Sequence, residues 1–285
     1  MSLFTARVLN YFGQGNTRTD YPGGGWSRNV LCLKLGRYQI RVVQDRNVIS
    51  NKIKREGQVH TTDIKVTGVK KFEEGVSVVN DICSLLSLAS FSQVTPFQYS
   101  FSGQGKRFNI SAQTMYFRPL IEIMDGNKTQ VYLEKIWMSY RKNKRSRKLA
   151  EVIRMLTIAE LPVQPLEVQL AQMFIVMENL KSTFARKSRI PFCEGFFRNC
   201  RRPSKPLYKQ PTIGFETLLT LMFKDVGMNP SLRRVTKLRN EIIHFGLSRK
   251  PYRSLIRDYE YCHDVVREYL LRLLGSGFIK ITART

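Results

Sequence analysis

Residues 231–246 read SLRRVTKLRNEIIHFG, and their apolar side chains recur at the spacing of an amphipathic helix. The residues that share one face of such a helix are Leu232, Val235, Leu238 and Ile242. Asn229 can cap the helix with Pro230 at its first position, and Gly246 can end it. The stretch therefore predicts a helix with one buried face in the C-terminal half of the chain.

The opposite face of this helix carries polar and basic residues. Its members follow one another at steps of four, three and four residues: Arg233, Lys237, Asn240 and His244. Arg239 lies at the edge of the buried face, five residues before His244 and about 140° around the helix. A single helix therefore does not direct Arg239 and His244 at one point.

Helical periodicity extends to both sides of this stretch. Residues 166–180 and 215–226 each carry an apolar stripe at three- and four-residue steps, and a last long helix is expected at 255–274. Between the first two lies a long irregular loop, expected at residues 187–211. These segments predict an all-α bundle of four or more helices.

The first part of the chain has a different pattern. Four segments alternate as strands do: Val30–Val43, Thr62–Val69, Phe97–Ser111 and Thr114–Met124. The third is expected to be a hairpin that turns at residues 103–105, and residues 76–86 repeat at helical spacing. We therefore expect strands packed with a helix in this part.

Together these patterns predict an α+β protein in three parts. Residues 1–128 are expected to form a mixed strand and helix domain, residues 129–165 a basic helical connector, and residues 166–285 the helical bundle. Pro162 and Pro165 interrupt the helical pattern and mark the boundary that we expect before the bundle.

The formal net charge of +25 in 285 residues predicts a polyanionic partner, with nucleic acid as the leading candidate. The longest apolar run, at residues 82–91, is shorter than the ~20 residues that span a bilayer, so no membrane partner is expected. The first residues lack the features of a secretory signal, which favours the cytoplasm. The five cysteines form no CxxC pair, and no histidine lies near Cys193 and Cys200, so we expect no metal site there.

One concentration of positive charge lies at residues 141–148, which read RKNKRSRK. On a helix this run is basic on every face, so it is expected to stay out of any core. The residues that we expect to bind RNA in it are Lys142, Lys144, Arg145 and Arg147. The alternative is a solvated connector.

A second concentration lies at residues 181–209, where nine basic residues accompany a single acid, Glu194. Aromatic residues alternate with them, and Arg201 and Arg202 lie near the centre. Cations that neutralise phosphates beside rings that stack on unpaired bases are typical of single-stranded nucleic-acid binding. We therefore expect RNA contacts here, with Arg233 and Lys237 adding to them; the alternative is that the phenylalanines anchor the loop to the bundle.

Residues 239–244, RNEIIH, resemble the arginine-polar-x-x-x-histidine motif of the HEPN superfamily, most closely its Apea-like branch. Members of this superfamily are all-helical nucleotide-binding and ribonuclease domains. His60 and His263 also follow an arginine at five or six residues, so the spacing alone does not single out His244. Its context does, because the polar Asn240 follows the arginine directly and amphipathic helices lie on both sides.

The resemblance covers about residues 166–274 and implies an endoribonuclease that needs no metal or other cofactor, acting in host defence or as a toxin. It implies a homodimer in which two motif helices meet at a two-fold axis and line one cleft. In that cleft the RNA 2′-hydroxyl attacks the neighbouring phosphorus and His244 transfers a proton. Arg239, oriented by Glu178, stabilises the phosphate charge, and Asn240 orients one of the partners.

Three other interpretations stay open. Residues 239–244 can be a structural helix end, with Arg239 paired to an acid and His244 near the helix C-terminus, where a cation is favourable. The domain can be a degenerate HEPN module that binds RNA or assembles without cutting. A metal-dependent nuclease could instead use Asp45, Asp63 and Lys65 of the N-terminal strands.

Overall fold

The computed structural model describes residues 3–45, 60–108, 119–161, 164–200 and 205–276. Its contacts divide the chain into two compact units, which we call unit 1 (residues 1–142 and 275–285) and unit 2 (residues 143–274). The protein is α+β as expected, with strands gathered in unit 1 and helices dominating unit 2. The division falls inside the helix at residues 126–147, within the segment 129–165 that was expected to be a basic helical connector.

Unit 1 is built on a seven-stranded antiparallel sheet. Its strands are β1 (Phe4–Leu9), β2 (Thr17–Asp20), β3 (Trp26–Leu35), β4 (Tyr38–Gln44), β5 (His60–Thr67), β6 (Thr95–Phe101) and β7 (Gln104–Arg107). They lie in the order β2-β3-β4-β5-β1-β6-β7, and every neighbouring pair is antiparallel. The first strand of the chain is therefore inserted between β5 and β6, and its residues were not among the expected strands.

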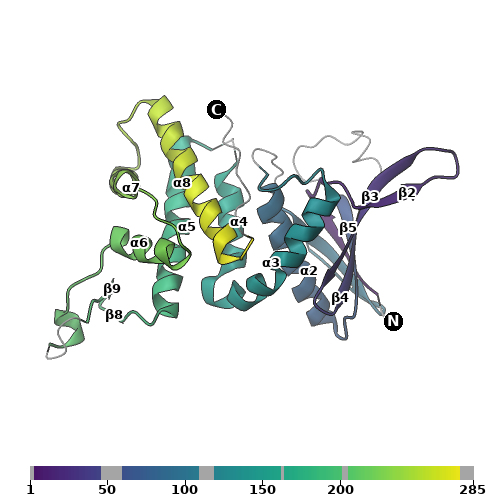
Figure 1. Ribbon diagram of the computed structural model, residues 1–285, viewed down its shortest axis with the longest axis horizontal. Helices are drawn as coiled ribbons and strands as arrows, with labels where there is room; N and C mark the ends of the chain where they lie inside the picture. Colours follow the sequence, from purple (N-terminus) through teal and green to yellow (C-terminus); the bar gives the residue numbers. More distant parts are fainter. Residues whose placement is uncertain (1–2, 46–59, 109–118, 162–163, 201–204, 277–285) are drawn as a thin grey trace. The chain divides into compact units, whose positions relative to one another are not determined.

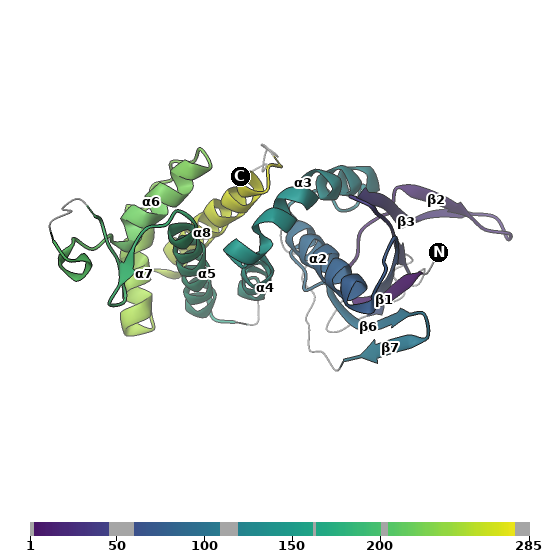
Figure 2. The ribbon, with the colours of Figure 1, turned by 90° about the horizontal axis from the view of Figure 1, so that it is seen from below.

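Two helices, α2 (Phe72–Ser90) and α3 (Gly126–Arg147), belong wholly or mainly to unit 1. The sheet curves around them (Figure 2). Gly75 of α2 lies so close to Phe4 that an added Cβ would overlap the ring, so glycine permits this tight approach of the helix to β1. Alternate residues of β1 and β5 are buried beneath the helices, and the residues between them are half-buried or exposed.

Most of the expected elements of unit 1 are confirmed, and two are corrected. The expected strand at Val30–Val43 is two strands, because the chain turns at Gly36, which adopts a positive φ of 60°. The expected strand at Thr114–Met124 is wrong in its described part, since residues 119–124 form no strand and α3 follows at once. The rest of that segment lies outside the described residues. The expected hairpin is β6-β7, but it turns at Ser102 and Gly103, because Gln104 and Gly105 of the predicted turn already pair in β7.

Unit 2 is a helical bundle with α5 at its centre (Figure 1). Its helices are α4 (Leu149–Ala159), α5 (Leu166–Lys187), α6 (Phe215–Asp225), α7 (Arg233–Phe245) and α8 (Tyr252–Leu273). α5 contacts the other four, and the apolar stripes expected at residues 166–180 and 215–226 point into this core. In this core the Phe223 ring of α6 packs edge-to-face on the Tyr269 ring of α8, with 5.6 Å between the ring centroids.

The segment expected to be an irregular loop contains local structure. Strands β8 (Phe192–Cys193) and β9 (Phe196–Phe197) form a small hairpin, followed by a 3-10 turn, η1 (Leu207–Lys209). Glu194 and Gly195 both adopt positive φ, which is the conformation of a tight two-residue hairpin turn. Helix α7 ends at Gly246 as expected, but it begins at Arg233, so the predicted start at Asn229 and Pro230 is wrong.

Candidate active site on helix α7

Helix α7 presents two chemically distinct faces. The residues predicted to be buried, Leu232, Val235, Leu238 and Ile242, are buried in the core of unit 2. The residues predicted to lie opposite them are exposed: Arg233, Lys237, Asn240 and His244. We call these four residues the α7 strip. The sequence pattern therefore placed both faces correctly, because burial here follows the helical period.

Arg239 lies at the edge of the buried face, where side chains from three directions hold it. Its Nη2 donates to Glu178 Oε1 of α5 at 3.1 Å, and its Nη1 donates to Asn240 Oδ1 at 3.0 Å. The guanidinium carbon lies 5.2 Å from the centroid of the Phe215 ring of α6. The expectation that Glu178 orients Arg239 is thus matched by a direct ion pair, and Asn240 contributes to the same positioning.

Lys181, the first of the basic residues counted at 181–209, is a fifth member of this arrangement that was not expected at the site. Its Nζ lies 2.5 Å from Glu178 Oε2 and 5.0 Å from the centroid of the Phe215 ring. Each oxygen of Glu178 therefore binds one cation, and the same ring faces both cations. The three-residue step from Glu178 to Lys181 on α5 was visible in the sequence, but the position of Phe215 depends on how α6 packs on α5.

His244 has a different environment from Arg239. Its side chain is exposed in the last turn of α7, and among the described residues it has no hydrogen bond or ion pair. The neighbouring apolar side chains Ile243, Phe245 and Leu247 are exposed as well, Phe245 to 76%. Within one chain no described interaction joins His244 to Arg239, in agreement with their expected separation around the helix.

The basic run at residues 141–148 does not stay wholly outside the core, which corrects the expectation for Arg147. Arg147 is 1% exposed, and its Nη2 donates to the Leu180 carbonyl at 2.9 Å and to the Tyr269 hydroxyl. Its guanidinium also lies over the Phe184 and Tyr269 rings, and burial lowers its pKa. A guanidinium can enter a core where a carbonyl, a hydroxyl and aromatic faces receive it. Arg147 is therefore structural, not an RNA-binding residue.

The other predicted residues of this run lie nearer the surface, with Lys142 and Arg145 exposed and Lys144 half-buried. The same run also contributes Arg141, whose Nη1 donates at 2.9 Å to the buried Asp81 of α2. Part of the run therefore stabilises the fold, and part of it remains available to solvent.

The segment around β8 and β9 combines an anchor with exposed rings. Phe197 is buried against Ala185 and Leu218, as the anchoring interpretation predicts. Three other aromatic residues are exposed, each with a cation 5.5 to 5.6 Å from its ring centroid, in the pairs Phe192 with Arg186, Phe196 with Arg198, and Tyr208 with Lys209. We call these three pairs the aromatic-basic surface. Arg201 and Arg202 lie outside the described residues.

The remaining histidines are engaged elsewhere. His263 is fully buried and paired with the buried Glu160. His60 Nε2 lies 3.1 Å from Asp63 Oδ1, and this hydrogen bond lowers the pKa of Asp63. Asp45 follows β4, where its backbone N–H donates to the Thr61 carbonyl. In the described ranges, no three His, Cys, Asp or Glu side chains gather into a group that could hold a metal ion.

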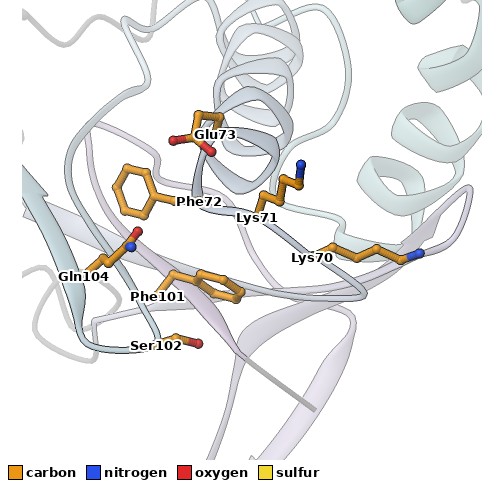
Figure 3. A pocket seen from close by; sticks show the side chains of 7 residues that line it. All are labelled: Lys70, Lys71, Phe72, Glu73, Phe101, Ser102 and Gln104. Carbon is orange, nitrogen blue, oxygen red and sulfur yellow. The ribbon is translucent and has the colours of Figure 1, made fainter.

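A shallow pocket of about 280 Å³ opens at the N-terminal end of α2 in unit 1 (Figure 3). Its lining is Lys70, Lys71, Phe72, Glu73, Phe101, Ser102 and Gln104. None of the residues that the sequence analysis proposed as a site lies in it, and the α7 strip belongs to the other unit. The pocket thus adds no group to the chemistry considered for His244.

Comparisons of the chain with protein-family models, with curated proteins and with solved structures found no match. In the described part of the chain, none of the helices has the length and apolar character needed to cross a membrane.

Proposed function

We propose that this protein is a metal-independent endoribonuclease of the HEPN type, with Arg239, Asn240 and His244 as its catalytic residues. The observation that carries the proposal is the arrangement on α7. Arg239 is held in place by Glu178 and Asn240, while His244 stays exposed at the end of the α7 strip. This provides one fixed cation for a phosphate and one imidazole that can accept or donate a proton.

The proposed reaction is an internal transfer at phosphorus. The 2′-hydroxyl oxygen forms a bond to the adjacent phosphorus, and the bond from phosphorus to the 5′-oxygen breaks. The products are a 2′,3′-cyclic phosphate and a 5′-hydroxyl, so the proton lost by the 2′-hydroxyl is balanced by one gained at the leaving oxygen. His244 transfers a proton in this step, and Arg239 stabilises the charge that develops on the phosphate oxygens.

Arg239 has donors left for this role. A guanidinium has five N–H groups, and the hydrogen bonds to Glu178 and Asn240 use two of them. The ion pair with Glu178 and the contact with Phe215 restrict the side chain before RNA binds, which lowers the entropy lost on binding. Lys181 pairs with the second oxygen of Glu178, so the carboxylate does not face Arg239 alone.

A homodimer completes the proposed site. Since Arg239 and His244 diverge around one helix, two copies of α7 that cross at a two-fold axis bring these side chains from both chains toward a common cleft. The exposed apolar side chains at the end of α7, Ile243, Phe245 and Leu247, supply a surface that such an interface would bury.

The aromatic-basic surface is proposed to bind the RNA strand. Exposed phenylalanine and tyrosine rings offer stacking faces for unpaired bases, and the exposed cations Arg186 and Lys209 beside two of them neutralise phosphates. Arg198, beside Phe196, is buried and serves to hold the segment together. Single-stranded or looped RNA is therefore the proposed substrate class.

The test is the change of His244 to alanine, with His60 to alanine as a matched control. His244→Ala should slow RNA cleavage by roughly a hundredfold or more, the usual scale for a lost proton-transfer group, and leave RNA affinity nearly unchanged. His60→Ala, in the other unit, should cut at the wild-type rate when RNA is saturating, because His60 takes no part in the proposed chemistry. Product ends are identified by mass spectrometry, in buffer with EDTA.

The expected products carry 2′,3′-cyclic phosphates, and an RNA whose scissile nucleotide lacks the 2′-hydroxyl should stay intact. Cleavage that EDTA abolishes and that persists in His244→Ala would refute the proposed site.

One observation favours the second candidate, a non-catalytic RNA-binding or assembly module. Arg239 joins α5 to α7 through Glu178 within a single chain, as a purely structural arginine would. Tight RNA binding with no cleavage at any pH, ionic condition or RNA sequence would select this candidate.

A further inference from the structure

The open face of the unit 1 sheet carries charge that the proposed function does not use. Side chains alternate across a strand, so the positions between the buried residues of β1, β4 and β5 lie on the opposite face of the sheet, where they are exposed or half-buried. The charged residues at these positions are Arg7 of β1, Arg41 of β4, and Asp63 and Lys65 of β5. Arg107, at the end of β7, adds a fifth charge. We call this set the open-face cluster; it holds four cations and one acid.

Strand register places two of these cations directly against each other. Arg41 of β4 lies opposite Lys65 of β5, with no acid between them. Neither side chain has an ion pair or hydrogen bond among the described residues. Like charges at directly opposite positions of an antiparallel pair lower the stability of the sheet. A bound anion removes this repulsion, so the pair is better suited to ligand binding than to holding the sheet together.

The next row across the same face repeats the pattern. Arg7 of β1 lies opposite Gln98 of β6, and Gln98 lies opposite Arg107 of β7. At a strand spacing of about 4.8 Å, Arg7 and Arg107 are about 10 Å apart in the direction across the strands. The cations therefore extend over five neighbouring strands, β4-β5-β1-β6-β7, as an elongated surface.

The single acid of the cluster is already occupied. Asp63 accepts a hydrogen bond from His60, and this bond, followed by the charges of Arg7 and Lys65, lowers its pKa. In the register Asp63 lies opposite Arg7, and not opposite Arg41 or Arg107. The face therefore keeps a net positive charge when its acid is ionised.

An aromatic ring lies among these cations. Phe97 of β6 is half-buried, with the guanidinium carbon of Arg7 5.9 Å from its centroid and the His60 ring packed at 5.6 Å. A row of cations next to a partly exposed ring can bind single-stranded nucleic acid, because the cations contact its phosphates and the ring stacks on a base.

We propose that the open-face cluster is a second nucleic-acid surface, which binds single-stranded RNA through its phosphates. Arg41 and Lys65 bind one phosphate, Arg7 and Arg107 bind others along the strand, and Phe97 offers a face to a base. This surface belongs to the unit that does not contain α7, and its binding does not depend on cleavage at His244.

The test measures how the affinity for RNA depends on salt. The full chain is titrated onto a fluorescent 20-nucleotide RNA with 2′-O-methyl groups throughout, which cannot be cleaved by 2′-hydroxyl attack, from 50 to 300 mM KCl. Each phosphate contact with a single strand contributes about 0.7 to the slope of log affinity against log salt. If both side chains contact phosphates, Arg41→Gln with Lys65→Gln should reduce the slope by about 1.4.

The matched control removes two exposed cations from the same unit, by Lys70→Gln with Lys71→Gln, and should leave the slope unchanged. The exchange Arg41→Lys with Lys65→Arg keeps both charges and should keep the wild-type slope. Thermal unfolding checks that each variant folds; the Gln pair should unfold no earlier than wild type, because the repulsion is relieved.

Three outcomes would overturn the proposal: an unchanged slope in the folded Gln pair, an equal loss of slope in the Lys70 and Lys71 control, or weakened binding to phosphatidylserine vesicles with RNA binding intact. The last outcome would identify an anionic membrane surface as the ligand. Because the RNA cannot be cut, none of these results depends on whether His244 is catalytic.

Discussion

Arg147 and Arg239 show how differently two arginines of one bundle can be used. Arg147 is enclosed by a carbonyl, a hydroxyl and two rings, so its charge serves the packing of unit 2. Arg239 is 24% exposed and shares the carboxylate of Glu178 with Lys181. The first is closed to a ligand, whereas the second is fixed and still accessible. Only the second fits a role in binding phosphate.

Arg147→Met should destabilise unit 2. The change leaves the Leu180 carbonyl and the Tyr269 hydroxyl without their buried donor, and a lost hydrogen bond to a charged group costs about 1.5 to 3 kcal/mol of unfolding free energy. Urea denaturation followed by circular dichroism measures the loss. The exposed Arg145→Met in the same run should stay within about 0.5 kcal/mol of wild type. Equal stabilities of the two variants would contradict a structural role for Arg147.

At the scale of elements, the hairpin of β8 and β9 holds the residues of the aromatic-basic surface in defined positions. Arg198 Nη1 donates to the Gln210 carbonyl at 3.1 Å, and the Ile213 N–H donates to the Phe197 carbonyl at 2.8 Å. These bonds tie both sides of the segment together while Phe197 anchors it. The exposed rings are therefore presented from a fixed base, which reduces the ordering cost of binding.

Phe196→Ala and Tyr208→Ala should each weaken binding of single-stranded RNA. Stacking of a base on an aromatic side chain contributes about 1 to 3 kcal/mol, so each change should raise the dissociation constant by about 5- to 150-fold. Fluorescence anisotropy with the uncleavable RNA measures this, with Leu221→Ala, another exposed apolar residue of unit 2, as control. Wild-type affinity in both aromatic variants would show that these two rings do not bind RNA.

At the scale of the whole molecule, the chain offers basic surfaces in both of its units. Unit 1 has the open-face cluster, and unit 2 has the α7 strip and the aromatic-basic surface. Among the described residues, some cations are bound within the fold, as Arg141 is by Asp81, and others lie on exposed faces. Such a distribution is typical of proteins that bind a long polyanion.

Phe245→Asp should convert the proposed dimer into a monomer and abolish cleavage. Phe245 is already exposed, so the folded monomer loses little, whereas an unpaired carboxylate in the buried interface is costly. Light scattering at micromolar concentration and the cleavage assay measure the two effects. Val131→Asp, at another exposed apolar position in unit 1, should change neither. A wild-type chain that is monomeric with and without RNA would contradict the composite site.

The sequence by itself determined the α+β class, the two faces of α7, the stripes of α5 and α6, and the hairpin of β6 and β7. These features are local, because burial follows the 3.6-residue or 2-residue period and turns follow backbone preferences within a few residues. The separation of Arg239 from His244 around one helix is also a local feature, because it follows from the 3.6-residue period. Each could be derived without knowing what packs against the element.

Only the tertiary structure decided which side chains from distant parts of the chain meet. Strand β1 pairs with β5 on one side and with β6 on the other. The residues of β1 alone do not indicate which strands will be its neighbours. Arg147 can be buried because the Leu180 carbonyl accepts its hydrogen bond and the Tyr269 ring lies beside its guanidinium. Phe215 faces Arg239 and Lys181 because α6 packs on α5. Such contacts depend on the summed packing of the whole unit, which no local pattern contains.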